Sequence, residues 1–156
     1  MTSDNIKKQI VELKDRFPYR KSAILPSLHL VLKEKNYVKE EDLRQVAEIL
    51  ELPPIEVFET ASFYTMFPTK RIGKYHIQVC TNLACSLLGA EELVNYLENK
   101  LKIKAGETTS DGIFTWATVE CLGSCGTAPV MQVNDGYYEN LTKEKVDQIL
   151  DDLLKT

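Results

Sequence analysis

The stretch Lys74-Tyr-His-Ile-Gln-Val-Cys-Thr-Asn-Leu-Ala-Cys85 decides the fold of the second half of the chain. Its first eight residues alternate the apolar Tyr75, Ile77 and Val79 with polar neighbours. This alternation is typical of a β-strand that buries one face. Two cysteines stand at the end of the strand and just beyond it, so the segment predicts a strand that leads directly into a cysteine-bearing turn.

A second strand with the same kind of ending is predicted further along the chain. Residues 113–119 are rich in β-branched and aromatic side chains, and Cys121-Leu-Gly-Ser-Cys125 follows them. Between the two strands, residues 87–101 repeat leucine at helical spacing, which predicts a helix. The order strand, helix, strand indicates an α/β unit.

The end of the chain completes this unit. Val130 to Val133 and Tyr137-Tyr138 are predicted to pair as a hairpin, because Asn134-Asp135-Gly136 between them is a strong turn signal. A last helix is expected from Thr142 to Leu154, with Thr142 as its N-cap. The four strands are predicted to form one mixed sheet.

The first half of the chain reads as helices. They are expected at residues 4–16, 22–35, 40–50 and 54–66, with Pro26 and Pro54 in first turns, where proline is tolerated. The apolar residues expected to face a core are Ile6, Ile10, Leu13 and Phe17, then Ile24, Leu25, Leu28, Val31 and Leu32, then Leu43, Val46, Ala47 and Leu50, and finally Ile55, Phe58, Ala61 and either Phe63 or Tyr64.

The predicted fold class is therefore α+β or α/β, with an N-terminal four-helix bundle followed by a sheet domain. The boundary is placed between Thr69 and Gly73, which gives domains at residues 1–70 and 71–156. About 70 residues of amphipathic helix hold only a thin core, so the helical domain is expected to pack against the neighbouring domain or to dock onto a partner protein.

Composition excludes several function classes. The chain has 156 residues, 19 basic and 23 acidic side chains and a net charge of -4, with no concentrated basic stretch. Nucleic acid is therefore not an expected partner. No apolar run approaches the ~20 residues of a membrane helix, and no signal or transit peptide is recognised, so a cytosolic location is expected.

The four cysteines carry the functional argument. Cys80 and Cys85 form a C-x4-C pair, and after 35 intervening residues Cys121 and Cys125 form a C-x3-C pair. Without an export signal, metal binding or redox chemistry is favoured over structural disulfides. If the two long strands are neighbours, their ends bring both pairs to one edge of the sheet.

Several kinds of site compete for these cysteines. Structural zinc also takes four thiolates, although C-x3-C is an unusual zinc spacing. Thiol redox chemistry favours C-x2-C, which is absent, and a Rieske centre needs two histidines within the ligand loops, where there are none. A 2Fe-2S cluster held by four cysteinates fits best, and zinc or thiol redox chemistry remain open.

Three segments together resemble a known family. They are the C-x4-C pair, Cys121-Leu-Gly-Ser-Cys-Gly-Thr-Ala-Pro-Val-Met-Gln-Val-Asn134, and Ala61-Ser-Phe-Tyr-Thr-Met-Phe67. They closely resemble the thioredoxin-like 2Fe-2S subunit of respiratory NADH:quinone oxidoreductase, complex I. The resemblance extends over nearly the whole chain and implies a thioredoxin-like fold for the second domain.

The resemblance also implies a function. It implies one 2Fe-2S cluster held by Cys80, Cys85, Cys121 and Cys125, and a partner subunit that binds FMN and NADH. The cluster would exchange single electrons with the flavin, and the chain would be active as an NADH dehydrogenase only with that partner. It would lie on the cytoplasmic side of the inner membrane through the complex, without direct membrane insertion.

Two other functions remain open at this point. The same motifs are found in the diaphorase subunits of NAD-reducing hydrogenases and of NAD-linked formate dehydrogenases. A zinc-stabilised interaction module without a redox role is the alternative from another class.

The small residues of the second cysteine loop, Gly123 and Gly126, either let backbone N–H groups approach the sulfurs or merely permit turns. Val130 is expected to cover the site with an apolar side chain.

Overall fold

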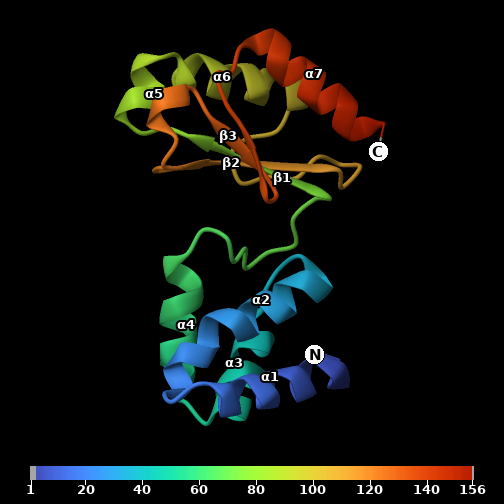
Figure 1. The fold of residues 1–156 in the computed structure, drawn as a ribbon. Coiled ribbons are helices and arrows are strands. Elements are labelled where there is room, and N and C mark those ends of the chain that lie inside the picture. Colours follow the sequence, from blue (N-terminus) through green and yellow to red (C-terminus); the bar gives the residue numbers. More distant parts are fainter. Residues whose placement is uncertain (1–2, 156) are drawn as a thin grey trace. The chain divides into compact units, whose positions relative to one another are not determined.

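The computed structural model describes residues 3–155 and divides into two compact units, one ending at Arg71 and the other beginning at Ile72. The first unit is helical. It contains α1 (Asp4–Arg16), the short 3-10 turn η1 (Arg20–Ala23), α2 (Ile24–Lys35), α3 (Glu40–Leu50) and α4 (Pro54–Phe63), as Figure 1 shows. All four predicted helices are confirmed. Residues 20–23 are a 3-10 turn, so α2 begins at Ile24, and Pro26 lies in its first turn as expected.

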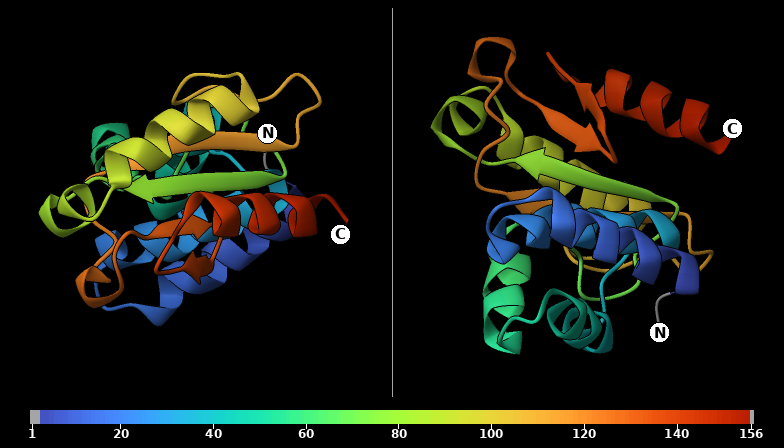
Figure 2. Two further views of the ribbon diagram at one scale, coloured as in Figure 1. Left: turned by 90° about the horizontal axis from the view of Figure 1, so that it is seen from above. Right: turned by 60° about the horizontal axis from the view of Figure 1, so that its bottom comes forward.

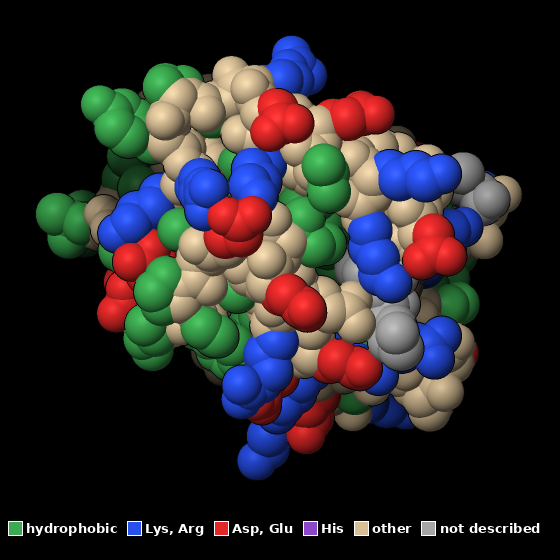
Figure 3. All heavy atoms as spheres, turned by 90° about the horizontal axis from the view of Figure 1, so that it is seen from below, with side chains coloured by type: hydrophobic (Ala, Val, Ile, Leu, Met, Phe, Trp, Pro, Cys, Tyr) green, Lys and Arg blue, Asp and Glu red, His purple; other side chains and the backbone are tan. Residues whose placement is uncertain are grey.

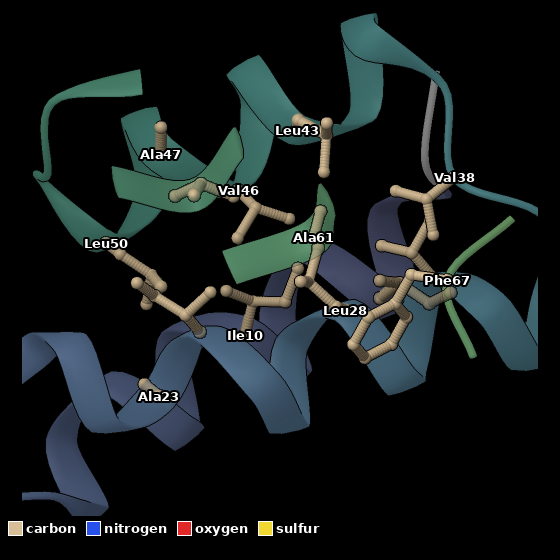
Figure 4. Close-up of a cluster of buried hydrophobic side chains, with 14 residues drawn as sticks. Ile10, Ala23, Leu28, Val38, Leu43, Val46, Ala47, Leu50, Ala61 and Phe67 are labelled. Carbon is tan, nitrogen blue, oxygen red and sulfur yellow. The ribbon is translucent and has the colours of Figure 1, made fainter. Parts of the chain in front are cut away.

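One apolar core holds the helical unit together. The close-up in Figure 4 shows side chains from the four helices and from the segment after α4 pointing toward one another. The buried members are Ile6, Ile10, Ala23, Ile24, Leu28, Val31, Val38, Leu43, Val46, Ala47, Leu50, Val57, Ala61 and Phe67. The stripe predicted for α3 is confirmed in full.

Two of the expected core residues face away from this core. Phe17 is 37% exposed because α1 ends at Arg16 and the chain becomes extended at Phe17. Ile55 is 62% exposed because α4 turns Val57 and Ala61 inward, one turn apart, which places Ile55 on another face. The prediction that residues 64–66 continue the helix is wrong, because α4 ends at Phe63 and the following turn brings Phe67 into the core.

The second unit is a mixed sheet covered by helices. Its strands are β1 (Tyr75–Cys80), β2 (Phe114–Val119), β3 (Met131–Val133) and β4 (Gly136–Tyr138), in the spatial order β2-β1-β3-β4. β1 and β2 are parallel, whereas β3 is antiparallel to both β1 and β4. The four predicted strands and the hairpin turn are confirmed.

The helices of this unit are α5 (Leu83–Leu87), α6 (Ala90–Leu101) and α7 (Lys143–Leu154). α6 and α7 lie over one face of the sheet (Figures 1 and 2). Leu93 and Leu97 of α6 and Val146 and Leu150 of α7 pack with strand residues such as Trp116 in one buried cluster. Thr142 caps α7 as predicted, because its side chain accepts a hydrogen bond from the Lys145 N–H.

One predicted helix is divided in the structure. The leucine spacing predicts a single helix over residues 87–101, but Leu87 ends α5 and α6 begins only at Ala90. Gly89 has a φ of 99°, a left-handed conformation that interrupts the helical path. The interruption separates α5, which carries Cys85, from α6, which covers the sheet.

The face of the molecule drawn in Figure 3 carries no large patch of positive or of negative charge. Figure 3 shows Lys and Arg side chains interspersed with Asp and Glu over one face of the molecule. Within residues 3–155, no helix is both long and apolar enough to cross a membrane.

A buried carboxylate organises the start of α3. Asp42 is fully buried, accepts a hydrogen bond from the Lys39 backbone N–H at 3.1 Å and forms an ion pair with the mostly buried Lys35 side chain. A buried ion pair is costly to break from one side, since the remaining charge stays partly desolvated without its counterion.

We therefore expect Asp42→Ala to lower the free energy of unfolding of the helical unit by about 2 to 3 kcal/mol. The neighbouring Glu41 is exposed in the same helical turn and is the matched control. Glu41→Ala should change the free energy of unfolding by less than about 0.5 kcal/mol. Urea denaturation followed by far-ultraviolet circular dichroism measures both, and equal effects would show that the ion pair of Asp42 contributes nothing specific.

Candidate metal centre

The parallel pairing of β1 and β2 brings the two cysteine pairs to one edge of the sheet. Cys80 is the last residue of β1 and is aligned with Val119, the last residue of β2. Cys121 follows two residues later. The Thr81 N–H donates to the Val119 carbonyl at 3.0 Å, so the two chains are still paired where the cysteine loops begin.

The four thiols lie near one another. The thiols of Cys85 and Cys121 donate toward the Cys80 sulfur and so favour its ionisation, and Cys125 is near enough to Cys85 to disfavour the ionisation of Cys85. All four cysteines are free thiols. The structure thus brings together the four residues that the sequence analysis singled out, from β1, α5 and the loop after β2.

Backbone N–H groups point at these sulfurs. Burial opposes ionisation of Cys80, but hydrogen bonds from the N–H groups of Asn82 and Leu122 and from neighbouring thiols outweigh it, so the pKa of Cys80 is lowered. The Gly123 N–H donates to Cys121 Sγ at 3.3 Å. These donors favour negative charge on sulfur, the state in which cysteine binds a metal.

Cys85 lies in a different environment. Burial raises the pKa of the Cys85 thiol, and its hydrogen bond to Cys80 raises it further, whereas the N–H of Val130 acts in the opposite direction. The pKa values of these two neighbouring thiols are therefore shifted in opposite directions.

Small apolar side chains cover one side of the cysteine site. Cys80, Cys85, Ala90, Ala128 and Val130 form a buried cluster, with Ala84 and Leu122 packed against it. Val130 is 1% exposed, which agrees with the expectation that it shields the site. In contrast, Cys121 and Cys125 are exposed. The site is closed on one side and open on the other.

The donor set fits an iron–sulfur cluster by its chemistry. Four thiols from the segments that follow β1 and β2, with N–H groups directed at sulfur and an apolar cover, match the needs of a cluster ligated by four cysteinates. Among residues 3–155, no three His, Cys, Asp or Glu side chains are placed as ligands of one metal ion. A 2Fe-2S cluster needs only two protein ligands on each iron.

The loop between Cys121 and Cys125 is fastened by residues that the sequence analysis gave no role. The Glu139 carboxylate accepts hydrogen bonds from the hydroxyls of Ser124 and Thr127, and the Tyr137 hydroxyl donates to the Leu122 carbonyl at 3.2 Å. The turn signal at Asn134-Asp135-Gly136 could have indicated in the sequence that residues 137–139 lie near this loop. A hairpin that turns there returns residues 137–139 alongside the chain before β3.

The two loop glycines differ in what the structure requires of them. Gly123 has a φ of 75°, where a side chain is strained, and its N–H contacts Cys121. Gly126 has no such backbone conformation, and a Cβ atom there would meet nothing within 4 Å. The structure therefore explains Gly123 as a residue that lets the backbone approach a sulfur, and it places no steric demand on Gly126.

Comparison with known proteins places the chain in one family. Residues 10–154 match the model of the family described as thioredoxin-like [2Fe-2S] ferredoxin. The chain is 48% identical over 136 residues to a subunit of the NADH-quinone oxidoreductase of Rhizobium meliloti, covering 87% of this chain and 81% of that protein. It is 46% identical over 132 residues to a subunit of the NADH-quinone oxidoreductase of Thermus thermophilus, covering 84% of this chain and 73% of that protein.

A solved structure shows the same fold. The air-oxidized NAD+-reducing [NiFe]-hydrogenase superposes on 85% of this chain with a TM-score of 0.71 and 24% sequence identity. This chain spans 23% of the length of that hydrogenase chain. At this identity the likeness concerns the fold, and it confirms the thioredoxin-like architecture expected from the sequence.

The contrast between the two loop glycines gives a prediction. We expect Gly123→Ala to lower the free energy of unfolding by about 1 to 2 kcal/mol, because alanine is strained in the left-handed region. Gly126→Ala is the matched control and should cost less than about 0.5 kcal/mol. Urea unfolding followed by the fluorescence of Trp116, the only tryptophan of the chain, measures both. An unchanged stability of the Gly123 variant would show that the loop adapts at no cost.

Proposed function

The chain belongs to the thioredoxin-like [2Fe-2S] ferredoxin family, and on that premise we propose that it is the electron-transfer subunit of an NADH-quinone oxidoreductase. Its cofactor is one 2Fe-2S cluster. The observation that carries the proposal is the meeting of all four cysteines at the carboxyl ends of β1 and β2, in a chain nearly half identical to named subunits of that enzyme.

We assign the cluster ligands to Cys80, Cys85, Cys121 and Cys125. When bound, the cluster supplies one-electron transfer. The chain's own residues set the conditions for it: the N–H groups of Asn82, Leu122 and Gly123 stabilise negative charge on the sulfurs. Val130 and its buried neighbours exclude water from the Cys80 and Cys85 side.

The proposal includes a partner that binds FMN and NADH. Within the described residues, neither a dinucleotide-binding glycine motif nor a Rossmann fold is present, so NADH and FMN would be held by another subunit. In the cell we place the chain at the cytoplasmic side of the inner membrane, attached through the complex.

The diaphorase and zinc alternatives have weaker support. The likeness to the NAD+-reducing [NiFe]-hydrogenase is 24% in sequence and concerns the fold, whereas the identity to the NADH-quinone oxidoreductase subunits is 46–48%. A zinc module would share the four thiols, but it has no counterpart among the matched family and relatives described above.

The ligand assignment is tested by replacing each cysteine with alanine. Each single variant should lose most of the visible absorbance and of the EPR signal of the reduced protein, because one iron would lack a protein ligand. Iron and acid-labile sulfide content are measured on the same samples. Ser110→Ala, at an exposed residue outside the cysteine loops, controls for the effects of substitution and purification in general. A variant with the full wild-type signal would remove that cysteine from the ligand set.

The iron, sulfide and zinc content of the wild-type protein tests the zinc alternative in the same experiment. We expect about two irons and two sulfides per chain and a red-brown colour. A colourless protein with one zinc ion per chain would overturn the proposal.

The helical unit is proposed as the docking unit for the flavin-binding partner. Ile55 and Phe63, both on α4, are 62% and 79% exposed and offer apolar surface that a partner could bury. The second unit offers a competing surface at Leu83 and Leu87 of α5, which are 71% and 77% exposed.

We expect Ile55→Ser/Phe63→Ser in the full chain to weaken binding to the flavin-binding subunit roughly tenfold or more, because buried aromatic and aliphatic anchors dominate interfaces. Leu83→Ser/Leu87→Ser is the comparison variant, and binding is measured by co-purification and by titration. Loss of binding in the Leu83/Leu87 variant alone would place the contact on the cluster unit. Retained EPR signals in both variants would show that each chain is correctly folded around its cluster.

A further inference from the structure

Glu139 is joined to the second cysteine loop by a compact hydrogen-bond network. Its Oε1 atom accepts from the Thr127 hydroxyl at 2.7 Å and also from the Ser124 hydroxyl. The two hydroxyls lie 2.8 Å from each other. Ser124 directly precedes Cys125, and Thr127 lies two residues after it, so one carboxylate oxygen holds both sides of Cys125.

Further ties from the same segment reach the same loop. The Tyr137 hydroxyl donates to the Leu122 carbonyl, next to Cys121. The Asn140 N–H donates to the Thr127 carbonyl at 2.7 Å. The strand pairing produces this arrangement, because the register of β3 with β4 aligns Met131 with Tyr138 and so returns residues 137–140 beside the loop.

Apart from the packing of Leu122 and the N–H groups of Leu122 and Gly123 that point at sulfur, few other contacts restrain the loop. Residues 120–124 lie outside any helix or strand, and Cys121 and Cys125 are both exposed. An exposed loop of this kind samples many conformations unless specific contacts restrain it. Hydrogen bonds to a charged acceptor are the stronger kind, which makes Glu139 the most effective of these restraints.

Glu139 also brings charge. Hydrogen bonds from Ser124 and then Thr127 lower the pKa of the Glu139 carboxyl, while partial desolvation acts in the opposite direction. The group is therefore a carboxylate at neutral pH. A fixed negative charge near a redox centre disfavours the addition of an electron.

We propose that Glu139 is a positioning residue of the cluster site, which fixes the loop carrying Cys121 and Cys125 through Ser124 and Thr127 and lowers the reduction potential of the cluster by its charge. The inference rests on the proposed function, in that it takes Cys121 and Cys125 as ligands. It adds a residue, distant in sequence from the cysteine pairs, that acts through the ligand loop and not as a ligand.

Three variants separate geometry from charge. Glu139→Gln keeps an oxygen at the position that accepts both hydroxyls and removes the charge. Ser124→Ala/Thr127→Val removes both hydroxyl donors and keeps the charge. Glu139→Ala removes both features, and Asp135→Asn in the exposed hairpin turn is the control for loss of one charge on the same hairpin.

The geometry is read from amide hydrogen exchange of residues 121–127, measured by mass spectrometry on cluster-loaded full-length protein. Exchange should become about tenfold faster in Glu139→Ala and in Ser124→Ala/Thr127→Val, because hydrogen bonds to a charged group are lost. It should rise less in Glu139→Gln, which keeps a weaker, neutral acceptor oxygen, and it should stay at the wild-type rate in Asp135→Asn. Wild-type exchange in both Glu139→Ala and Ser124→Ala/Thr127→Val would overturn the positioning role.

The effect of the Glu139 charge on the reduction potential is measured by a redox titration followed by EPR. The potential should shift to more positive values in Glu139→Gln, and by more than in Asp135→Asn. Equal potentials in Glu139→Gln and wild type would overturn the electrostatic part. The proposed function fails separately, since it fails only if wild-type protein holds no 2Fe-2S cluster or if Cys121 and Cys125 prove dispensable for it.

Discussion

The parallel pairing of β1 with β2 is the constraint on which the cysteine site depends. Because both strands run in the same direction, Cys80 and the loop that begins after Val119 leave the sheet at one edge. Antiparallel strands of six residues would separate the two cysteine pairs by roughly 20 Å, the length of a strand. A parallel pair requires a long crossover, which α5 and α6 supply between Cys80 and Phe114.

The core of the second unit protects the register of this pairing. Ile77 and Trp116 are aligned neighbours, both fully buried, and the Trp116 indole N–H donates to the Ile103 carbonyl at 3.0 Å. A slip of one residue would turn this face of β2 outward and shift the end of the strand relative to Cys80. Packing far from the sulfurs thus sets where the two strands end, and the Glu139 carboxylate then accepts hydrogen bonds from Ser124 and Thr127 in the loop that follows.

The sequence alone predicts most of the helices and strands, but it does not predict the finer contacts between them. Strand alternation and the Asp135-Gly136 turn indicated the sheet, and the cysteine spacing indicated the site, because these signals are local and strong. Ile55 was misplaced because a ten-residue helix with few polar residues leaves its buried face undetermined. The break at Gly89 and the role of Glu139 depend on a single backbone angle and on cross-hairpin hydrogen bonds, which hydrophobic periodicity does not report.

The unequal exposure of the two cysteine pairs connects the fold to a role as a subunit. Cys80 and Cys85 are buried beneath Val130 and its neighbours, whereas Cys121 and Cys125 lie on an exposed loop. A redox centre enclosed on all sides would exchange electrons slowly, and one fully open to water would lose the apolar cover that tunes its potential. A site that its own chain closes on one side and leaves open on the other satisfies both demands. The apolar cover protects Cys80 and Cys85, and the exposed side of Cys121 and Cys125 leaves a route for electrons to enter or leave the site.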